Sequence, residues 1–518
     1  MRSPPTITKL MSSYRELPVE LWKEIFEFAI GESWLLDPLY EPQEPRTRLY
    51  HTWNSQDATT THSHQHSESI SSLSSILDNN NHMNARRGPR LLEPSLHTKL
   101  AIVATSSQWR KMGLPYLFRA VTFTSLRQLQ LLTGLVRASR YRYVPAPGPQ
   151  KIRILLEGKG TGYGVMIRRI LTKIDLGRDP SDHIIYADIL SDLLKCCPNL
   201  RIYVNQNIQA GLPTPAPIIN ALSDIGSRKA QILPNEEEPS KGTTEDDYLG
   251  IERLEWSGKE SLIVGDLTFL LRTTPYLRKL VLGPVFLCSI RLSDTLSEPS
   301  ISLVHLQSIH MDMTSLHRAH IRYTRRWLIP SLRHLQVLIG FAPWQSDLLF
   351  FLDAAGSGLE SLHLRVADHC SMTAENWSDI LTRCLKISSL SFNVAAMPVL
   401  SPSIVLPELR SVGLEGCLPD FRATNEYDRP ESDRREQLEE HLSALIARNT
   451  TLRVIQMLDD EFLLISGKNA QGYGTTGWEV PRRKKLSREF RTWKEWSSNL
   501  RVAGISLENC EGDAIGLS

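Results

Sequence analysis

Residues 277–282 read LRKLVL, so that Leu277, Leu280 and Leu282 follow one another at spacings of three and two residues. The same spacing of apolar residues recurs along the chain. The other copies are Leu171-Ile174-Leu176, Ile251-Leu254-Trp256, Leu306-Ile309-Met311, Leu332-Leu335-Val337, Leu359-Leu362-Leu364, Ile387-Leu390-Phe392, Leu409-Val412-Leu414 and Leu452-Ile455-Met457, with a weaker copy at Leu200-Tyr203 and a last one at Val502-Ile505-Leu507. Between residues 251 and 387, successive copies start 26 to 29 residues apart. This regular period predicts similar units stacked side by side.

Each copy predicts one short strand. Because side chains alternate between the two faces of a strand, the last two apolar positions face the core and the residue between them faces the opposite, concave surface. The predicted concave residues are Glu255, Val281, His310, Gln336, His363, Ser391, Gly413 and Gln456. They share no charge sign and form no aromatic platform, so they indicate neither a nucleic acid nor a phosphopeptide as the target.

The rest of each unit is long enough to return as a helix or an irregular arc, as in Ile189-Leu190-Leu193-Leu194. The pattern resembles that of irregular leucine-rich repeats. It predicts an α/β fold in which residues 165–518 form a solenoid, with loops near 232–248, 419–436 and 466–486. An ordinary α/β domain whose strands share a spacing is the alternative. Residues 124–164 are expected to be a linker before this body.

A second pattern lies near the amino end and is split into two pieces. Residues 17–30 read LPVELWKEIFEFAI, whose apolar residues recur at the three-and-four spacing of a helix. Pro18 suits a first helical turn, where its missing N–H costs nothing. Residues 95–123 read SLHTKLAIVATSSQWRKMGLPYLFRAVTF and predict two helices and a turn. On their own, such helices could also belong to the core of the body.

The two pieces resemble an F-box of the fungal, basidiomycete type. The resemblance lies in Leu17-Pro18, Glu20, Ile25 and Phe26, and in Trp109 followed by basic residues and LPYLF. It implies a non-catalytic subunit of a ubiquitin ligase whose residues 1–30 and 95–123 dock on a Skp-type adaptor in a cullin complex, while the repeats bind an unidentified target protein. The residues expected at the adaptor contact are Leu17, Pro18, Leu21, Ile25 and Trp109. The alternative is a leucine-rich-repeat scaffold outside any ligase, with these helices as its cap.

Residues 31–94 separate the two pieces. Between His51 and Ala85, 24 of 35 residues are Ser, Thr, Asn, Gln or His, a composition that predicts disorder because it buries too little apolar surface. His62, His64 and His66 alternate within this insert. Without cysteine or carboxylate partners they indicate a polar tract rather than a metal site, although the spacing leaves a metal site open.

Composition narrows the classes of function. Lys plus Arg number 59 and Asp plus Glu number 57, so no overall field favours nucleic acid. No apolar run is long enough for a membrane span or a secretion signal. The seven cysteines lack paired spacing and are expected to be reduced thiols, which favours the cytoplasm or the nucleus. The cluster Arg482–Lys485 is either a solvated loop or a nuclear signal.

No catalytic motif is found. The sequence lacks G-x-S-x-G, H-E-x-x-H and paired C-x-x-C, and EGKGTGYG at 157–164 has neither phosphate-loop order, so it is interpreted as a turn. We therefore expect no enzyme activity, no cofactor and no metal.

Overall fold

The computed structural model describes most of the chain outside the polar insert and several long connections. The described residues are 21–22, 25–26, 36–39, 92–144, 154–157, 162–177, 179–207, 213–230, 250–258, 260, 262–283, 285–286, 300–312, 324, 327–339, 344–366, 372–401, 404–417, 431–459, 493–509, 512 and 514–515.

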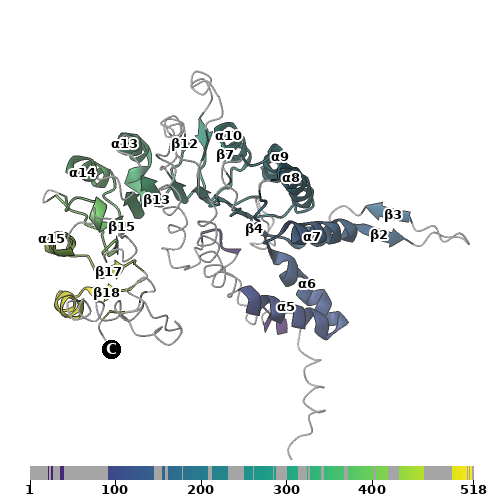
Figure 1. Cartoon of the computed structure of the whole chain (residues 1–518), viewed down its shortest axis with the longest axis horizontal. Coiled ribbons are helices and arrows are strands. Elements are labelled where there is room, and N and C mark those ends of the chain that lie inside the picture. The colour runs from purple at the N-terminus through teal and green to yellow at the C-terminus, as the bar shows by residue number, and fades with distance from the viewer. Residues whose placement is uncertain are drawn as a thin grey trace, which may run out of the picture.

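One parallel sheet runs through the molecule. Among the described residues, twelve strands hydrogen-bond in their order along the chain. They are β1 (Ala120–Phe123), β4 (Arg169–Thr172), β5 (Ile202–Asn205), β6 (Arg253–Trp256), β8 (Lys279–Leu282), β11 (Ser308–Asp312), β13 (His334–Ile339), β14 (Ser361–Val366), β15 (Ser389–Asn393), β16 (Ser411–Glu415), β17 (Val454–Met457) and β18 (Ser506–Glu508). The sheet is open, with β1 and β18 at its edges, and it bends into an arc (Figure 1).

Helices cover the outer side of this arc (Figure 1), because parallel neighbours require crossover connections. They are α7 (Leu126–Ser139), α8 (Pro180–Lys195), α9 (Ala216–Ala230), α10 (Val264–Thr273), α13 (Trp344–Ala355), α14 (Ala374–Arg383) and α15 (Glu431–Arg448). The start of α8 illustrates why they form. Asp179 caps it by accepting a hydrogen bond from the Ser181 amide at 2.9 Å, and Pro180 occupies the first turn.

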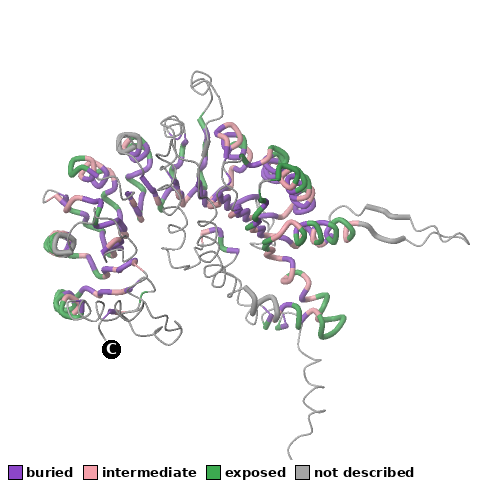
Figure 2. Tube along the Cα trace, viewed as in Figure 1, coloured by how far each residue is buried: buried purple, intermediate pink, exposed green. Residues whose placement is uncertain are grey.

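The core lies between the sheet and the outer helices, where buried residues gather in Figure 2. One row of register partners from β4 to β17 is at most 2% exposed: Ile170, Tyr203, Leu254, Leu280, Ile309, Leu335, Leu362, Leu390, Val412 and Ile455. Burying one such aliphatic side chain stabilises the fold by roughly 1.5–3 kcal/mol. The elongated core therefore holds the strands in one register.

Shorter elements connect the units. Within the described ranges, two-stranded pairs form between β2 (Tyr141–Val144) and β3 (Ile154–Glu157), between β7 (Leu262–Ile263) and β9 (Val285–Phe286), and between β10 (Ile301–Ser302) and β12 (Trp327–Leu328). Short 3-10 turns are η4 (Tyr163–Met166), η5 (Gly356–Gly358) and η6 (Val394–Ala396). The hairpin β2–β3 projects from α7 away from the arc (Figure 1).

Glycine allows close approach between neighbouring units. A Cβ on Gly226 of α9 would lie 2.2 Å from the carbonyl oxygen of Thr273, at the end of α10. No other residue fits there without moving backbone.

The amino-terminal part of the described chain forms an α-helical hairpin, α5 (Leu92–Thr105) and α6 (Ser107–Arg119), which leads directly into β1. The sheet therefore begins at Ala120, inside the stretch assigned to the helical motif. Since α7 is the first outer helix and packs beside α8, the predicted linker 124–164 contributes to the body.

The register corrects two predicted copies of the repeat. Ile170 pairs with Tyr203, so the first copy is Ile167-Ile170-Thr172 rather than Leu171-Ile174-Leu176. Leu507 pairs with Ile455, which makes Leu507 the middle position of the last copy. The predicted loop 419–436 overlaps the start of α15 at Glu431. The predicted loops 232–248 and 466–486, and nearly all of the insert 31–94, lie outside the described residues.

Candidate functional site

A small apolar cluster, separate from the main core, forms near the amino end. Its buried members are Trp22, Phe26 and Ile102, and Trp109, Met112 and Tyr116 pack against them. The ring centroid of Trp109 lies 4.8 Å from that of Trp22 and 5.3 Å from that of Phe26. We call this set the aromatic cluster. It joins Trp22 and Phe26 to the α5–α6 hairpin across the polar insert.

Local chemistry explains how the hairpin positions Trp109. Ser106 stands between the helices in an extended conformation, and its Oγ accepts a hydrogen bond from the Trp109 amide at 3.1 Å, which starts α6. Gly113 faces α5 so closely that a Cβ there would lie 2.8 Å from Ile102 Cγ2. The two helices therefore pack tightly, and Trp109 is held against the aromatic cluster.

The structure separates the residues predicted for adaptor binding. Leu21 and Ile25 are 42% and 43% exposed, whereas their neighbours Trp22 and Phe26 are buried. The sequence placed all four in one stripe, but the helix turns two of them inward and two outward. Trp109 is half-buried within the aromatic cluster. Leu17 and Pro18 lie outside the described residues.

The inner face of the sheet, on the side away from the outer helices, is the second candidate surface. The predicted concave residues share one register row, from Glu255 on β6 to Gln456 on β17. Along β11 to β17 the first and third strand residues are mainly polar: Ser308, His310, His334, Gln336, Ser361, His363, Ser389, Ser391, Ser411, Gly413, Val454 and Gln456. The residues at these positions include no Asp, Glu, Lys or Arg, so they do not form a charged groove.

The other half, over β4 to β8, combines basic and aliphatic residues. We call it the basic-aliphatic site. It consists of the first and third residues of each strand, on the inner face, and of the residue before each strand, at the edge where the strands begin: Arg168, Arg169, Leu171, Arg201, Ile202, Val204, Glu252, Arg253, Glu255, Arg278, Lys279 and Val281. Six are basic and two are acidic. Its centre is covered, since Ile202, Val204 and Val281 are 0%, 1% and 6% exposed.

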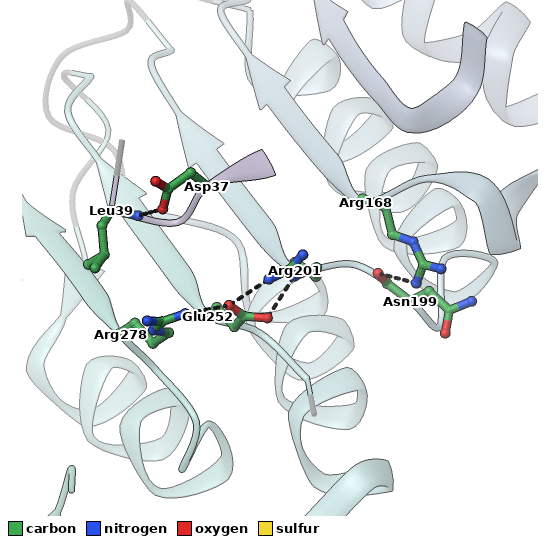
Figure 3. Close-up of polar contacts among 7 residues, drawn as sticks. All are labelled: Asp37, Leu39, Arg168, Asn199, Arg201, Glu252 and Arg278. Carbon is green, nitrogen blue, oxygen red and sulfur yellow. Dashed lines mark hydrogen bonds and ion pairs between the residues drawn. The ribbon is translucent and has the colours of Figure 1, made fainter. Parts of the chain in front are cut away.

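Ion pairs order this basic-aliphatic site. Arg201 donates two hydrogen bonds to the Glu252 carboxylate, at 2.6 and 2.9 Å, and Arg278 lies 3.8 Å from the same carboxylate (Figure 3). Arg253 pairs with Glu255. Burial acts to raise the pKa of Glu255, but the charges of Arg253 and Lys279 and hydrogen bonds from Ser257 and Arg253 outweigh it and lower the pKa to about 2. Glu255 is therefore ionised at neutral pH.

Two further sets of polar contacts lie beside the sheet. His363 Nε2 lies 3.1 Å from the Glu415 carboxylate, and Arg365 approaches the other oxygen at 3.7 Å. Near the ends of β4 to β6, Asn207 Nδ2 donates to Tyr186 at 2.8 Å and to Glu260 at 3.0 Å. Burial raises the pKa of Glu260. These contacts join neighbouring units.

Comparison with known proteins gives no identity. No family model matches the chain, and no protein with a curated function matches it. The described residues contain no helix with the length and apolar character needed to cross a membrane. Within those same ranges, no group of three His, Cys, Asp or Glu side chains is arranged to hold a metal ion. His62, His64 and His66 lie outside the described residues.

Sequence reasoning missed the basic-aliphatic site. Its signal was present, because the two residues after the first apolar position are Arg-Arg at 168–169, Glu-Arg at 252–253 and Arg-Lys at 278–279. The repeat pattern assigns only the central residue of each strand to the concave surface, and only the register of β4 aligns Arg168 and Arg169 with the basic residues of the other strands.

Proposed function

We propose that this protein is the substrate-recognition subunit of a Skp–cullin–F-box ubiquitin ligase in the cytoplasm or nucleus. In this proposal α5, α6 and the helix containing Leu21 and Ile25 are the F-box, and the arc is an irregular leucine-rich-repeat solenoid that binds a target protein. The chain performs no chemistry itself. It raises the effective concentration of a target lysine near a ubiquitin-conjugating enzyme bound elsewhere in the complex.

The observation that supports the proposal best is the exposure of Leu21 and Ile25. A helix that served only as a cap would turn its apolar side chains onto the sheet. Here Trp22 and Phe26 already fill the aromatic cluster, which is separate from the main core, and Leu21 and Ile25 remain more than two-fifths exposed. Paired aliphatic residues one helical turn apart fit an apolar groove of a partner.

The order of motifs along the chain gives the proposal its second support. The Leu-Pro start, the tryptophan, the basic residues and LPYLF occur in F-box order, and they precede the repeated units. The aromatic cluster brings the residues on either side of the insert into one helical unit.

A binding experiment with the full chain tests the proposal. Purified Skp-type adaptor is titrated against wild type and against the Leu21→Asp/Ile25→Asp double variant. Two aliphatic contacts contribute on the order of 1–2 kcal/mol each at an interface, so we expect binding to weaken by about a hundredfold. Ile184→Asp is the matched control, because Ile184 is 65% exposed on α8, far along the chain from the aromatic cluster.

The second candidate is a repeat scaffold outside any ligase. It is favoured by the direct run of α6 into β1 and by Phe118 of α6, which belongs to the main core, since both would suit a cap on the first strand. Failure of wild type to bind the adaptor in the same titration would support this scaffold and reject the ligase subunit.

A further inference from the structure

Four residues of the polar insert lie on the inner side of the arc. The segment that carries Asp37 and Leu39 lies in front of the strands that follow Arg201, Glu252 and Arg278 (Figures 1 and 3). Leu36 is only 6% exposed and Pro38 is buried, while Asp37 is exposed. A stretch that the sequence analysis assigns to a disordered insert thus contains buried apolar residues, and it lies on the same side of the sheet as the basic-aliphatic site.

This short segment has a defined turn. The Asp37 Oδ1 accepts a hydrogen bond from the Leu39 amide at 2.9 Å, and Pro38 between them has a fixed φ angle. Such a turn holds Leu36 and Leu39 in a set relation to the carboxylate of Asp37. The segment is therefore preorganised rather than a random stretch of the insert.

The chemistry of the basic-aliphatic site complements that of the segment. The site has buried aliphatic side chains, Ile202, Val204 and Val281, and a surplus of basic over acidic residues at the strand starts. The segment supplies two leucines, a proline and one carboxylate. Apolar burial provides affinity in such a contact, and charge complementarity fixes the orientation of the segment and disfavours basic partners.

We propose that the basic-aliphatic site is the surface that binds the target, that it takes a short segment in which leucines flank an aspartate–proline turn, and that Leu36–Leu39 of the chain itself occupies it in this structure. The identification of the bound segment as part of a target protein rests on the proposed function, but binding of the segment does not require the adaptor. A target segment must displace the chain's own segment, so the internal contact reduces apparent affinity by the fraction of molecules that are occupied.

The first test measures binding in trans to the full chain. The probe is a fluorescein-labelled peptide of residues 33–42, SWLLDPLYEP, followed by fluorescence anisotropy. The Leu36→Asp/Leu39→Asp variant, called the emptied variant, should free the site. We expect the peptide to bind the emptied variant at least about tenfold more tightly than wild type, because no internal segment competes. The control peptide carries the same two Leu→Asp substitutions and should not bind.

A second variant locates the peptide. Arg278 has a side chain that is 40% exposed, and its ion pair with Glu252 is long, at 3.8 Å, so Arg278→Glu reverses a charge with little structural cost. In the emptied variant it should weaken peptide binding by about fivefold or more. Equal peptide affinity for wild type and the emptied variant, absence of binding to the emptied variant, or no effect of Arg278→Glu would each overturn the proposal.

A labelling experiment keeps the proposal testable if the emptied variant folds poorly. Asp37→Lys changes an exposed residue and removes the charge complementarity. Val281→Cys places a thiol at a site that is 6% exposed, and its maleimide labelling, read by peptide mass mapping, should accelerate about tenfold when Asp37→Lys is added. Thr122→Cys, exposed on β1 in the same register row, should label equally in both backgrounds. An unchanged rate at Val281→Cys rejects occupancy.

The two proposals fail separately. In the proposed function, adaptor binding depends on Leu21 and Ile25, which the emptied variant leaves unchanged. Adaptor binding and peptide binding are therefore both measured on the emptied variant. Retained adaptor binding without peptide binding rejects only the inference about the basic-aliphatic site, and peptide binding without adaptor binding rejects only the ligase.

Discussion

His441 of α15 offers a direct test of the packing between an outer helix and the sheet. The residue is 0% exposed, its Nε2 lies 3.2 Å from the Met397 carbonyl oxygen, and its ring packs on Phe392 at a centroid distance of 5.4 Å. Its Nδ1 has no hydrogen-bond partner in the part of the chain that the structure describes. Burial without a second partner disfavours the charged ring and lowers the pKa to about 4, although the Met397 carbonyl acts in the opposite direction.

The expected effect on stability follows from this pKa. The unfolded chain binds a proton at His441 below its ordinary value of 6.5, while the folded chain resists it down to about 4. Stability from this residue is therefore fully present above about pH 6.5 and is lost as the pH falls toward 4. At about 1.4 kcal/mol per pKa unit the loss is roughly 3 kcal/mol.

Replacing His441 with leucine removes the titration and keeps an apolar side chain of similar size. Urea denaturation of wild type and His441→Leu, in the same buffers from about pH 7 to pH 4, measures the difference in unfolding free energy. We expect this difference to shift in favour of the variant by about 3 kcal/mol on acidification. His305, which is exposed and stacked on Tyr276, provides the control substitution His305→Leu. A constant difference across this range would refute the account of His441 as a buried neutral ring.

Three further substitutions probe other contacts. Gly226→Ala should destabilise the fold by about 1–3 kcal/mol in urea denaturation, because its Cβ would meet the Thr273 carbonyl oxygen. Gly134→Ala, with nothing within 4 Å of the new Cβ on α7, should instead stabilise by about 0.5–1 kcal/mol, and equal effects at the two glycines would contradict this reasoning. Trp109→Ala should lower the unfolding free energy by on the order of 2–3 kcal/mol, because it removes the ring contacts of Trp109 with Trp22 and Phe26. Faster hydrogen exchange confined to α5 and α6 is the expected sign, and exchange that rises throughout the sheet would argue against a separate aromatic cluster.

The repeat period predicted the strands of the central units, since Leu280, Leu362 and Leu390 all face the core as expected. The first unit was placed four residues too late, because Leu171 and Ile174 mimic the pattern. In the true copy the last position is Thr172, a polar residue that only the pairing with Asn205 reveals. Spacing alone carries no information about which neighbour a strand selects.

At the candidate adaptor site, the three-and-four spacing identified an apolar helix but not its orientation. An apolar stripe this wide can bury either of its two sides. Which side is buried depends on where Trp109 and Ile102 lie. The position of Leu36–Leu39 could not be predicted either, because composition is averaged over many residues and the polar residues of the insert outnumber this four-residue segment. Tertiary contacts decide both.

The chain-order pairing of the strands has a consequence for engineering. Among the described residues, each strand of the twelve-stranded sheet bonds only to its neighbours in that sheet, so a backbone break between α9 and β6 would cut just one ladder of the sheet, that of β5 with β6. Two separately expressed halves would each keep their remaining strand pairs and would each gain one newly exposed edge strand. Such halves suit a complementation experiment, in which reassembly of the two halves reports on the β5–β6 interface alone.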